Sequence, residues 1–290
     1  MSGSIGSSPP SGSNPFSFKQ FDDLIAGIEL LYQLGRRLSA ATTNQSCEYL
    51  IQEAKMAFVK TMMGVLGFLR FIQSSRYHAR EIDVVTDLSS ASVMARQVFE
   101  DALSFLYLSE PSLTQDQKEF RALVWRYCGA KEALDSARFA GVFNPGISPA
   151  AVERANFGQQ LENPPFKGML ESIESGRRGR IRQGRENHVL HDREILQRRG
   201  IQTETYDLYS KVLSNFAHFS TFSHQLMTET SAEWEKSWRA FLPPAICVAN
   251  FLAEAIEVFL ETFPQTRGLL KDYEPPLIAN FRSWLRNQQS

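Results

Sequence analysis

The segment SSASVMARQVFEDALSFLYL, residues 89–108, decides the fold class. Its apolar side chains recur three or four positions apart, at Ala91, Ala95, Phe99, Ala102 and Leu106. That spacing is the repeat of one face of an α-helix, whereas a half-buried strand alternates apolar and polar residues. No stretch of the chain combines such alternation with hairpin-turn residues. The sequence therefore predicts an all-α protein.

Helical spacing extends from this segment over most of the chain. Long helices are predicted over about 18–41, 47–73, 84–108, 114–139, 203–229 and 231–263. The motif SSRYHARE ends the second of them, and the paired prolines Pro243 and Pro244 interrupt the last. Short helices follow Ser148 and Pro276. The predicted architecture is a helical bundle of four to five long helices with short accessory helices.

The chain divides into a tail and one predicted domain. Residues 1–15 consist mainly of Ser, Gly and Pro and lack a basic start and an apolar run, so we expect a disordered tail and no signal peptide. Residues 16–290 are expected to form a single helical domain. Its segment 163–200 has few large apolar residues and several glycines, and we interpret it as a basic connection with one or two short helices.

Net charge, cysteine spacing and the length of the apolar runs indicate which kinds of partner and cofactor to expect. A net charge of −1 gives no global field for nucleic acid or anionic membranes. Cys47, Cys128 and Cys247 lie far apart, so reduced thiols in a cytoplasm are expected, and no cofactor or metal. The most apolar runs, TMMGVLGFL and AFLPPAICVANFLA, fall short of the roughly 20 residues of a membrane span. They are predicted to be core helices, with no membrane partner.

Polar residues on two predicted helices form the first candidate site. Arg96 and Glu100 lie one turn apart beside the apolar stripe, and we expect the pair to be at least partly buried. The segment YSKVLSNFAHFSTFSH, residues 209–224, places uncharged polar groups along one narrow arc. We expect the two polar faces to pack together. The candidate catalytic set is Arg96, Glu100, Ser214, Asn215 and His218. A purely structural seam remains the alternative.

An arginine cluster forms the second candidate site. Residues 177–199 hold eight arginines against three acidic residues, a net charge of +5. Arginine forks match phosphate oxygens. The candidate nucleic-acid-binding residues are Arg177, Arg178, Arg180, Arg182 and Arg185. The alternative is a solvated loop that balances acidic helices. The neighbouring His188 and His191 have the spacing of metal ligands but lack an evident third ligand.

Three segments, FLYLSEP, FRALVWRYCGAKEAL and GIQTETYDLYSKVLSNFAHF, resemble an uncharacterised bacterial family of HEPN-like helical proteins. HEPN denotes the higher-eukaryote and prokaryote nucleotide-binding domain. The resemblance covers about residues 84–225. It implies an all-helical bundle with Arg96 and Glu100 on one long helix and Ser214 and His218 on another. The family's activity is not established; the net charge of +5 over residues 177–199, with Arg96, Glu100 and His218, favours a HEPN-like module that binds nucleic acid or nucleotide in bacterial defence or stress response.

Many HEPN relatives are ribonucleases that carry an Arg, then four to six residues, then a His. In these relatives the Arg and the His assist transfer at the RNA 2′-hydroxyl, usually across a dimer. Here Asn215 precedes His218, but no arginine stands at the required distance. Arg182 with His188, and Arg185 with His191, match the spacing by position only. Three hypotheses remain open: a nucleic-acid- or nucleotide-binding module, a metal-independent ribonuclease that uses His218 with Arg96, and a structural protein that forms homodimers.

Overall fold

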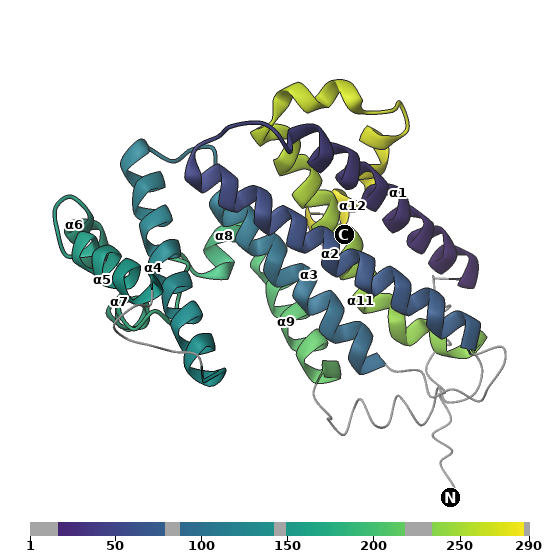
Figure 1. The fold of residues 1–290 in the computed structure, drawn as a ribbon. Coiled ribbons are helices and arrows are strands. Elements are labelled where there is room, and N and C mark those ends of the chain that lie inside the picture. The colour runs from purple at the N-terminus through teal and green to yellow at the C-terminus, as the bar shows by residue number, and fades with distance from the viewer. Residues whose placement is uncertain (1–16, 79–87, 142–148, 218–233, 287–290) are drawn as a thin grey trace, which may run out of the picture.

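The computed structural model describes residues 17–78, 88–141, 149–217 and 234–286, and its described part contains helices and no strand (Figure 1). The five longest helices are α1 Phe18–Thr42, α2 Tyr49–His78, α3 Leu88–Leu108, α4 Gln115–Phe139 and α11 Trp234–Thr262. The shorter ones are α5 Pro149–Leu161, α6 Phe166–Glu171, α7 Ser175–Arg182, α8 Asp192–Arg198, α9 Thr203–Ala217, η1 Pro264–Leu269 and α12 Glu274–Arg286. The predicted all-α bundle is confirmed. The predicted tail, residues 1–15, and the cap at Ser148 lie outside the described residues.

Two hydrophobic clusters hold the helices together. The larger one is formed by α1, α2, α3, α9, α11 and α12, with α11 buried among the others. Its aromatic centre includes Phe58 and Phe259, whose ring centroids lie 4.4 Å apart, and Phe99 against Phe251 at 4.6 Å. The smaller cluster joins α4 to α5, α6 and α7 through residues such as Phe120, and this group projects from one end of the bundle in Figure 1.

Helix α11 passes through Pro243 and Pro244 without interruption, which corrects the predicted break. A proline inside a helix removes a backbone hydrogen bond and costs about 3 kcal/mol. The adjoining side chains of Phe241, Ala245 and Val248 are completely buried. Burial of a large apolar side chain contributes about 1.5–3 kcal/mol, so packing of this helix outweighs the local preference.

Helix α2 also exceeds its predicted bounds, because SSRYH continues the helix as far as His78. As a result, the segments 49–74 and 238–262 form helical stretches of 26 and 25 residues, longer than expected. Both are long and apolar enough to cross a membrane by length and composition alone. In the second stretch, 78% of the most apolar window is buried inside the protein, as in a core helix.

The basic segment 163–200 contains three short helices, α6, α7 and α8, where one or two were predicted. Helices α7 and α8 end in the same way, with Gly184 at φ +67° and Gly200 at φ +68°. In each case the residue after the glycine donates its N–H to the carbonyl oxygen five positions earlier. The N–O distance is 2.9 Å from Arg185 to Arg180 and 3.0 Å from Ile201 to Leu196. A helix C-cap with positive φ favours glycine, because a Cβ makes this backbone conformation less favourable.

Candidate functional site

Helices α3 and α9 pack together as predicted, and they bring three candidate residues into one cluster. Nε of Arg96 lies 2.7 Å from Oε1 of Glu100, and Nη1 of Arg96 donates to Oγ of Ser214 at 3.1 Å. Asn215 is exposed. His218 lies outside the described residues, so its predicted approach to this pair stays a prediction.

The Arg96–Glu100 pair is more exposed than expected, since 43% of the Arg96 side chain and 50% of the Glu100 side chain reach solvent. Both residues lie on the outer edge of the α3–α9 contact, where water screens their charges. An exposed pair of this kind contributes little to stability and polarises a substrate only weakly.

The five candidate arginines do not form one free basic patch. Four of them contact acceptors within the described residues: Arg177 contacts backbone carbonyls and His191, Arg178 the Glu171 carbonyl, Arg180 Glu186, and Arg182 Glu162. The later arginines are also paired, namely Arg193 with Asp207, Arg198 with Glu110, and Arg199 with Glu254 and Glu261. Arg185 is exposed. Most of the charge predicted for this segment is therefore compensated by carboxylates brought close by the fold.

Arg177 differs from the other four because its side chain is 7% exposed. Its guanidinium donates to the carbonyl oxygens of His188, at 3.0 Å, and Leu190. Its nearest carboxylate is Glu186, at 3.6 Å and without a hydrogen bond, and its Nε has no partner. A buried cation held mainly by neutral acceptors retains a strong field toward an incoming anion.

Arg177 lines a cavity of about 470 Å³ between α4, α7 and α8. Two further arginines from different elements line the same cavity, Arg121 and Arg198. Both bind Glu110, with N–O distances of 2.6 Å each. Burial alone would raise the pKa of Glu110, but the hydrogen bond from Arg198 and the charge of Arg121 lower it. This carboxylate compensates one of the two guanidinium charges.

The remaining walls of the cavity are formed by apolar side chains, by two carboxylates and by Gln117, Ser172 and His191. The apolar side chains are Leu113, Phe120, Met169, Ile173, Val189 and Leu190. The carboxylates Glu174 and Glu194 also line the cavity, and each accepts a backbone N–H near the start of α7 or α8. Acidic side chains are stabilised at helix N-termini, so both have a structural partner there.

His188 and His191 point to different neighbours and do not form a shared metal site. Nε2 of His188 lies 3.3 Å from Oγ of Ser104, whereas Nδ1 of His191 lies 2.6 Å from Nη2 of Arg177. Among the residues that the structure describes, no three or more His, Cys, Asp or Glu side chains group as metal ligands. The sequence interpretation missed Ser104 and Arg121. Ser104 stands eight positions after Arg96, on the same helical face, which is the signal that could have identified it.

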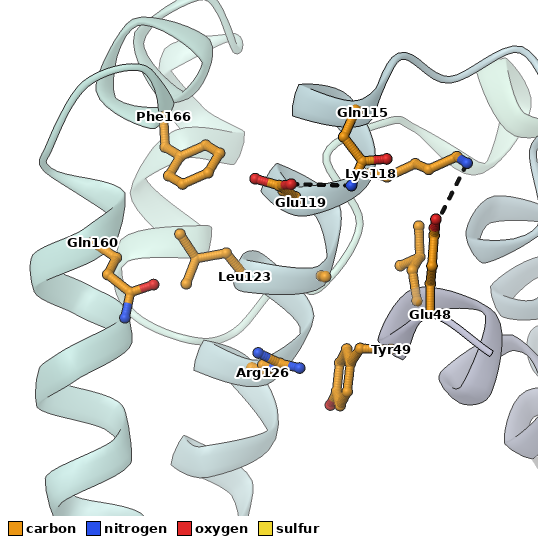
Figure 2. A pocket seen from close by; sticks show the side chains of 11 residues that line it. Glu48, Tyr49, Gln115, Lys118, Glu119, Leu123, Arg126, Gln160 and Phe166 are labelled. Carbon is orange, nitrogen blue, oxygen red and sulfur yellow. Dashed lines mark hydrogen bonds and ion pairs between the residues drawn. The ribbon is translucent and has the colours of Figure 1, made fainter. Parts of the chain in front are cut away.

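A second cavity, of about 270 Å³, lies between α2, α4 and α6 (Figure 2). Its Arg126 guanidinium stacks on the ring of Tyr49, 3.4 Å from the centroid. Burial, followed by the hydrogen bond to Glu53, raises the pKa of Tyr49. Figure 2 shows Phe166 and Leu123 across from these two, and Lys118 paired with Glu48 at 3.7 Å. Because its volume is smaller and its one arginine lies against the Tyr49 ring, this cavity is the weaker candidate for a ligand.

Comparison of the chain with protein-family models, with curated proteins and with solved structures gives no match. The class that the fold defines is therefore an all-α helical bundle with an arginine-lined cavity.

Proposed function

We propose that this protein binds a nucleotide, with its phosphate group in the cavity lined by Arg121, Arg177 and Arg198. The observation that carries the proposal is the Arg177 side chain, which is buried, charged and not hydrogen-bonded to a carboxylate. Guanidinium groups bind phosphate oxygens through paired N–H donors. Of the hypotheses drawn from the sequence, nucleotide binding is the one that this arrangement favours.

The distribution of charge favours a single nucleotide over a long nucleic acid. Binding along a phosphate backbone needs several uncompensated Lys or Arg side chains on one surface. Here Arg180, Arg182 and Arg193 are exposed but paired with Glu186, Glu162 and Asp207. A compact ligand with one phosphate end needs only the local field of the cavity.

The apolar wall provides a surface for the rest of the ligand. The Phe120 ring lines the cavity and stacks on Phe166, with centroids 6.2 Å apart and planes at 17°. Pockets of about 300–1,000 Å³ with apolar walls and a few polar groups are typical of small-molecule sites, and about 470 Å³ falls within that range. A base or ribose would contact Phe120, Met169 and Ile173 while the phosphate contacts the arginines. The resemblance to HEPN-like proteins points to the same ligand class.

Isothermal titration calorimetry tests the proposal. The full chain is titrated with each of the four nucleoside 5′-monophosphates and with the matching nucleosides, at low and at physiological salt. We expect at least one monophosphate to bind, to bind at least about tenfold more tightly than its nucleoside, and to weaken as salt increases. Equal affinity for nucleoside and nucleotide, or binding of none of the eight, would contradict the proposal.

A further inference from the structure

A hydroxyl, an imidazole and a carboxylate lie side by side in space at a second place in the fold, where α3 meets the loop before α8. Oγ of Ser104 lies 3.3 Å from Nε2 of His188, and Nδ1 of the same ring lies 3.7 Å from Oδ1 of Asp192. Burial alone would raise the pKa of Asp192, but the interaction with the nearby His188 imidazole lowers it. Asp192 therefore keeps its charge beside the imidazole.

The His188 ring is fixed by its neighbours. It stacks on Trp125, with centroids 6.0 Å apart and planes at 17°, and contacts Tyr107 at 4.6 Å. The residue is 8% exposed. Its backbone carbonyl accepts from Arg177 at 3.0 Å, which anchors the loop. A fixed ring between a hydroxyl and a carboxylate has the geometry of a general base that activates a nucleophile.

Ser104 opens onto a cavity of about 530 Å³ that is separate from the arginine-lined one. Four carboxylates line this cavity, namely Glu53, Glu100, Asp101 and Glu132, against the single ammonium of Lys60. The amide of Asn187 also lines it, next to His188 in the chain. The negative lining favours a substrate with a positive charge. Lys60 and Asn187, which line the same cavity, carry N–H groups of the kind that stabilise an oxyanion.

We propose that Ser104, His188 and Asp192 form a hydrolytic site for esters that carry a cationic group. Nε2 of His188 takes the Ser104 proton as Oγ forms a bond to the acyl carbon, and the same nitrogen returns the proton to the departing alcohol as the ester C–O bond breaks. Water then attacks the acyl-serine, losing its proton to His188, and the acid is released as the proton returns to Ser104. Asp192 acts as a positioning residue, because it orients the imidazole and stabilises its protonated form.

Covalent labelling with a fluorophosphonate probe tests the serine. The full chain is incubated with the probe, and the modified residue is located by peptide mass spectrometry. We expect one label on Ser104, no label in Ser104→Ala, and full labelling in Ser112→Ala, which alters an exposed hydroxyl near the start of α4. Absence of labelling in the wild type, or a label that persists in Ser104→Ala, would overturn the proposal.

The positioning of His188 by Asp192 is tested separately from folding. His188 is buried, so His188→Gln risks unfolding, whereas Asp192 is 38% exposed in its side chain. We expect Asp192→Asn to slow labelling at least about tenfold with an unchanged melting temperature, and Asp192→Glu to recover part of the rate. A labelling rate in Asp192→Asn equal to that of the wild type would show that Asp192 does not position His188 for catalysis.

The substrate class has its own measurement. Hydrolysis of the cationic ester acetylcholine is compared with that of the anionic ester 3-acetoxypropanoate, since both are acetates of primary alcohols. The acidic lining predicts at least about tenfold higher kcat/KM for the cation, and Lys60→Gln should lower kcat more than KM if its ammonium stabilises the oxyanion. Preference for the anionic ester would reject the cationic class. Neither result bears on nucleotide binding, since the two cavities are separate.

Discussion

Nη2 of Arg177 lies 2.6 Å from Nδ1 of His191, at the wall of the arginine-lined cavity. A guanidinium carries donors only, so Nδ1 accepts and the imidazole proton resides on Nε2. That N–H faces Glu174, whose Oε2 is 3.9 Å away. The buried arginine thus fixes both the tautomer of His191 and the direction in which its proton points.

The negative charge of Glu174 repels an anion in this cavity. Removing this charge should therefore raise the affinity for an anion, whereas removing an arginine should lower it. The Glu174 side chain is 64% exposed, and it accepts from the N–H of Gly176 at 3.3 Å. Glu174→Gln keeps an acceptor for that N–H and removes the charge. We expect the affinity for a nucleoside monophosphate to rise by about two- to fivefold, measured by calorimetry at low salt. A lower affinity would indicate that Glu174 contacts the ligand as an acceptor.

Glu254, on α11, binds three arginines from other parts of the chain. It is fully buried and binds Arg199, Arg282 and Arg286 at 3.3, 2.8 and 3.0 Å, which joins α11 to α12 and to the turn after α8. Removing the charge takes from Arg286 the carboxylate that it binds, whereas Arg199 keeps Glu261 at 2.9 Å and Arg282 keeps Glu257 at 3.6 Å. We expect Glu254→Gln to reduce the free energy of unfolding by about 3–5 kcal/mol in urea titrations. Glu162→Gln, which breaks an exposed pair with Arg182, should cost about 1 kcal/mol or less.

The same carboxylate predicts acid sensitivity. Burial alone would raise the pKa of Glu254, but the charges of Arg282, Arg286 and Arg199 lower it. A pKa that is lower in the folded than in the unfolded chain contributes stability above the unfolded value of about 4.3. This contribution is lost as the pH falls through the folded value. Urea titrations at pH 7 and below pH 4 should therefore show a smaller loss of stability in Glu254→Gln than in the wild type, and an equal loss would contradict the assignment.

Gly27 permits the close packing of α1 on α12. A Cβ built at this position would meet Cζ of Phe281 at 2.7 Å, whereas at Gly67, inside α2, nothing lies within 4 Å. We expect Gly27→Ala to destabilise the fold by about 1–3 kcal/mol. Gly67→Ala should stabilise it by up to about 1 kcal/mol, because alanine favours helix. Thermal unfolding of both variants checks this pair, and equal melting temperatures would show that Phe281 moves aside.

The exposed ion pair on α3 gives a contrasting prediction. Glu100→Gln removes the carboxylate that binds Arg96 at 2.7 Å, in a place where water screens both charges. We expect a change of less than about 1 kcal/mol in the free energy of unfolding. A larger loss in urea titrations would contradict the exposure and screening of this pair.

The fold could be predicted from the sequence because helical spacing is a local property. The stripe in α3 and the capping box that opens α4, where Thr114 and Gln117 bond reciprocally, depend on residues within a few positions. Pro243 and Pro244 were misinterpreted because tertiary packing, which the local pattern does not contain, decides their cost. The extra turns of α2 run through SSRYH, which contains no Gly or Pro to stop a helix.

The candidate sites were less predictable because their partners are distant in the chain. Arg198 binds Glu110 across 88 positions, and Ser104 contacts His188 across 84. A count of charges cannot reveal that carboxylates from other elements pair with four of the eight arginines of segment 177–199. Burial of Arg177 is likewise a property of how α4 and α7 pack. The sequence located the right segment, but the fold decides which arginine remains available to a ligand.

The most direct test of nucleotide binding compares two matched arginines. Arg198 and Arg182 are each about half exposed and each bind one glutamate, but only Arg198 lines the cavity. Calorimetric titration with the four nucleoside 5′-monophosphates is performed on the wild type, Arg198→Gln and Arg182→Gln. The proposal predicts that Arg198→Gln weakens binding at least about tenfold, since a charge-assisted phosphate contact is lost, while Arg182→Gln changes it less than about twofold. Equal losses in both variants, or none in either, would contradict a phosphate site in this cavity.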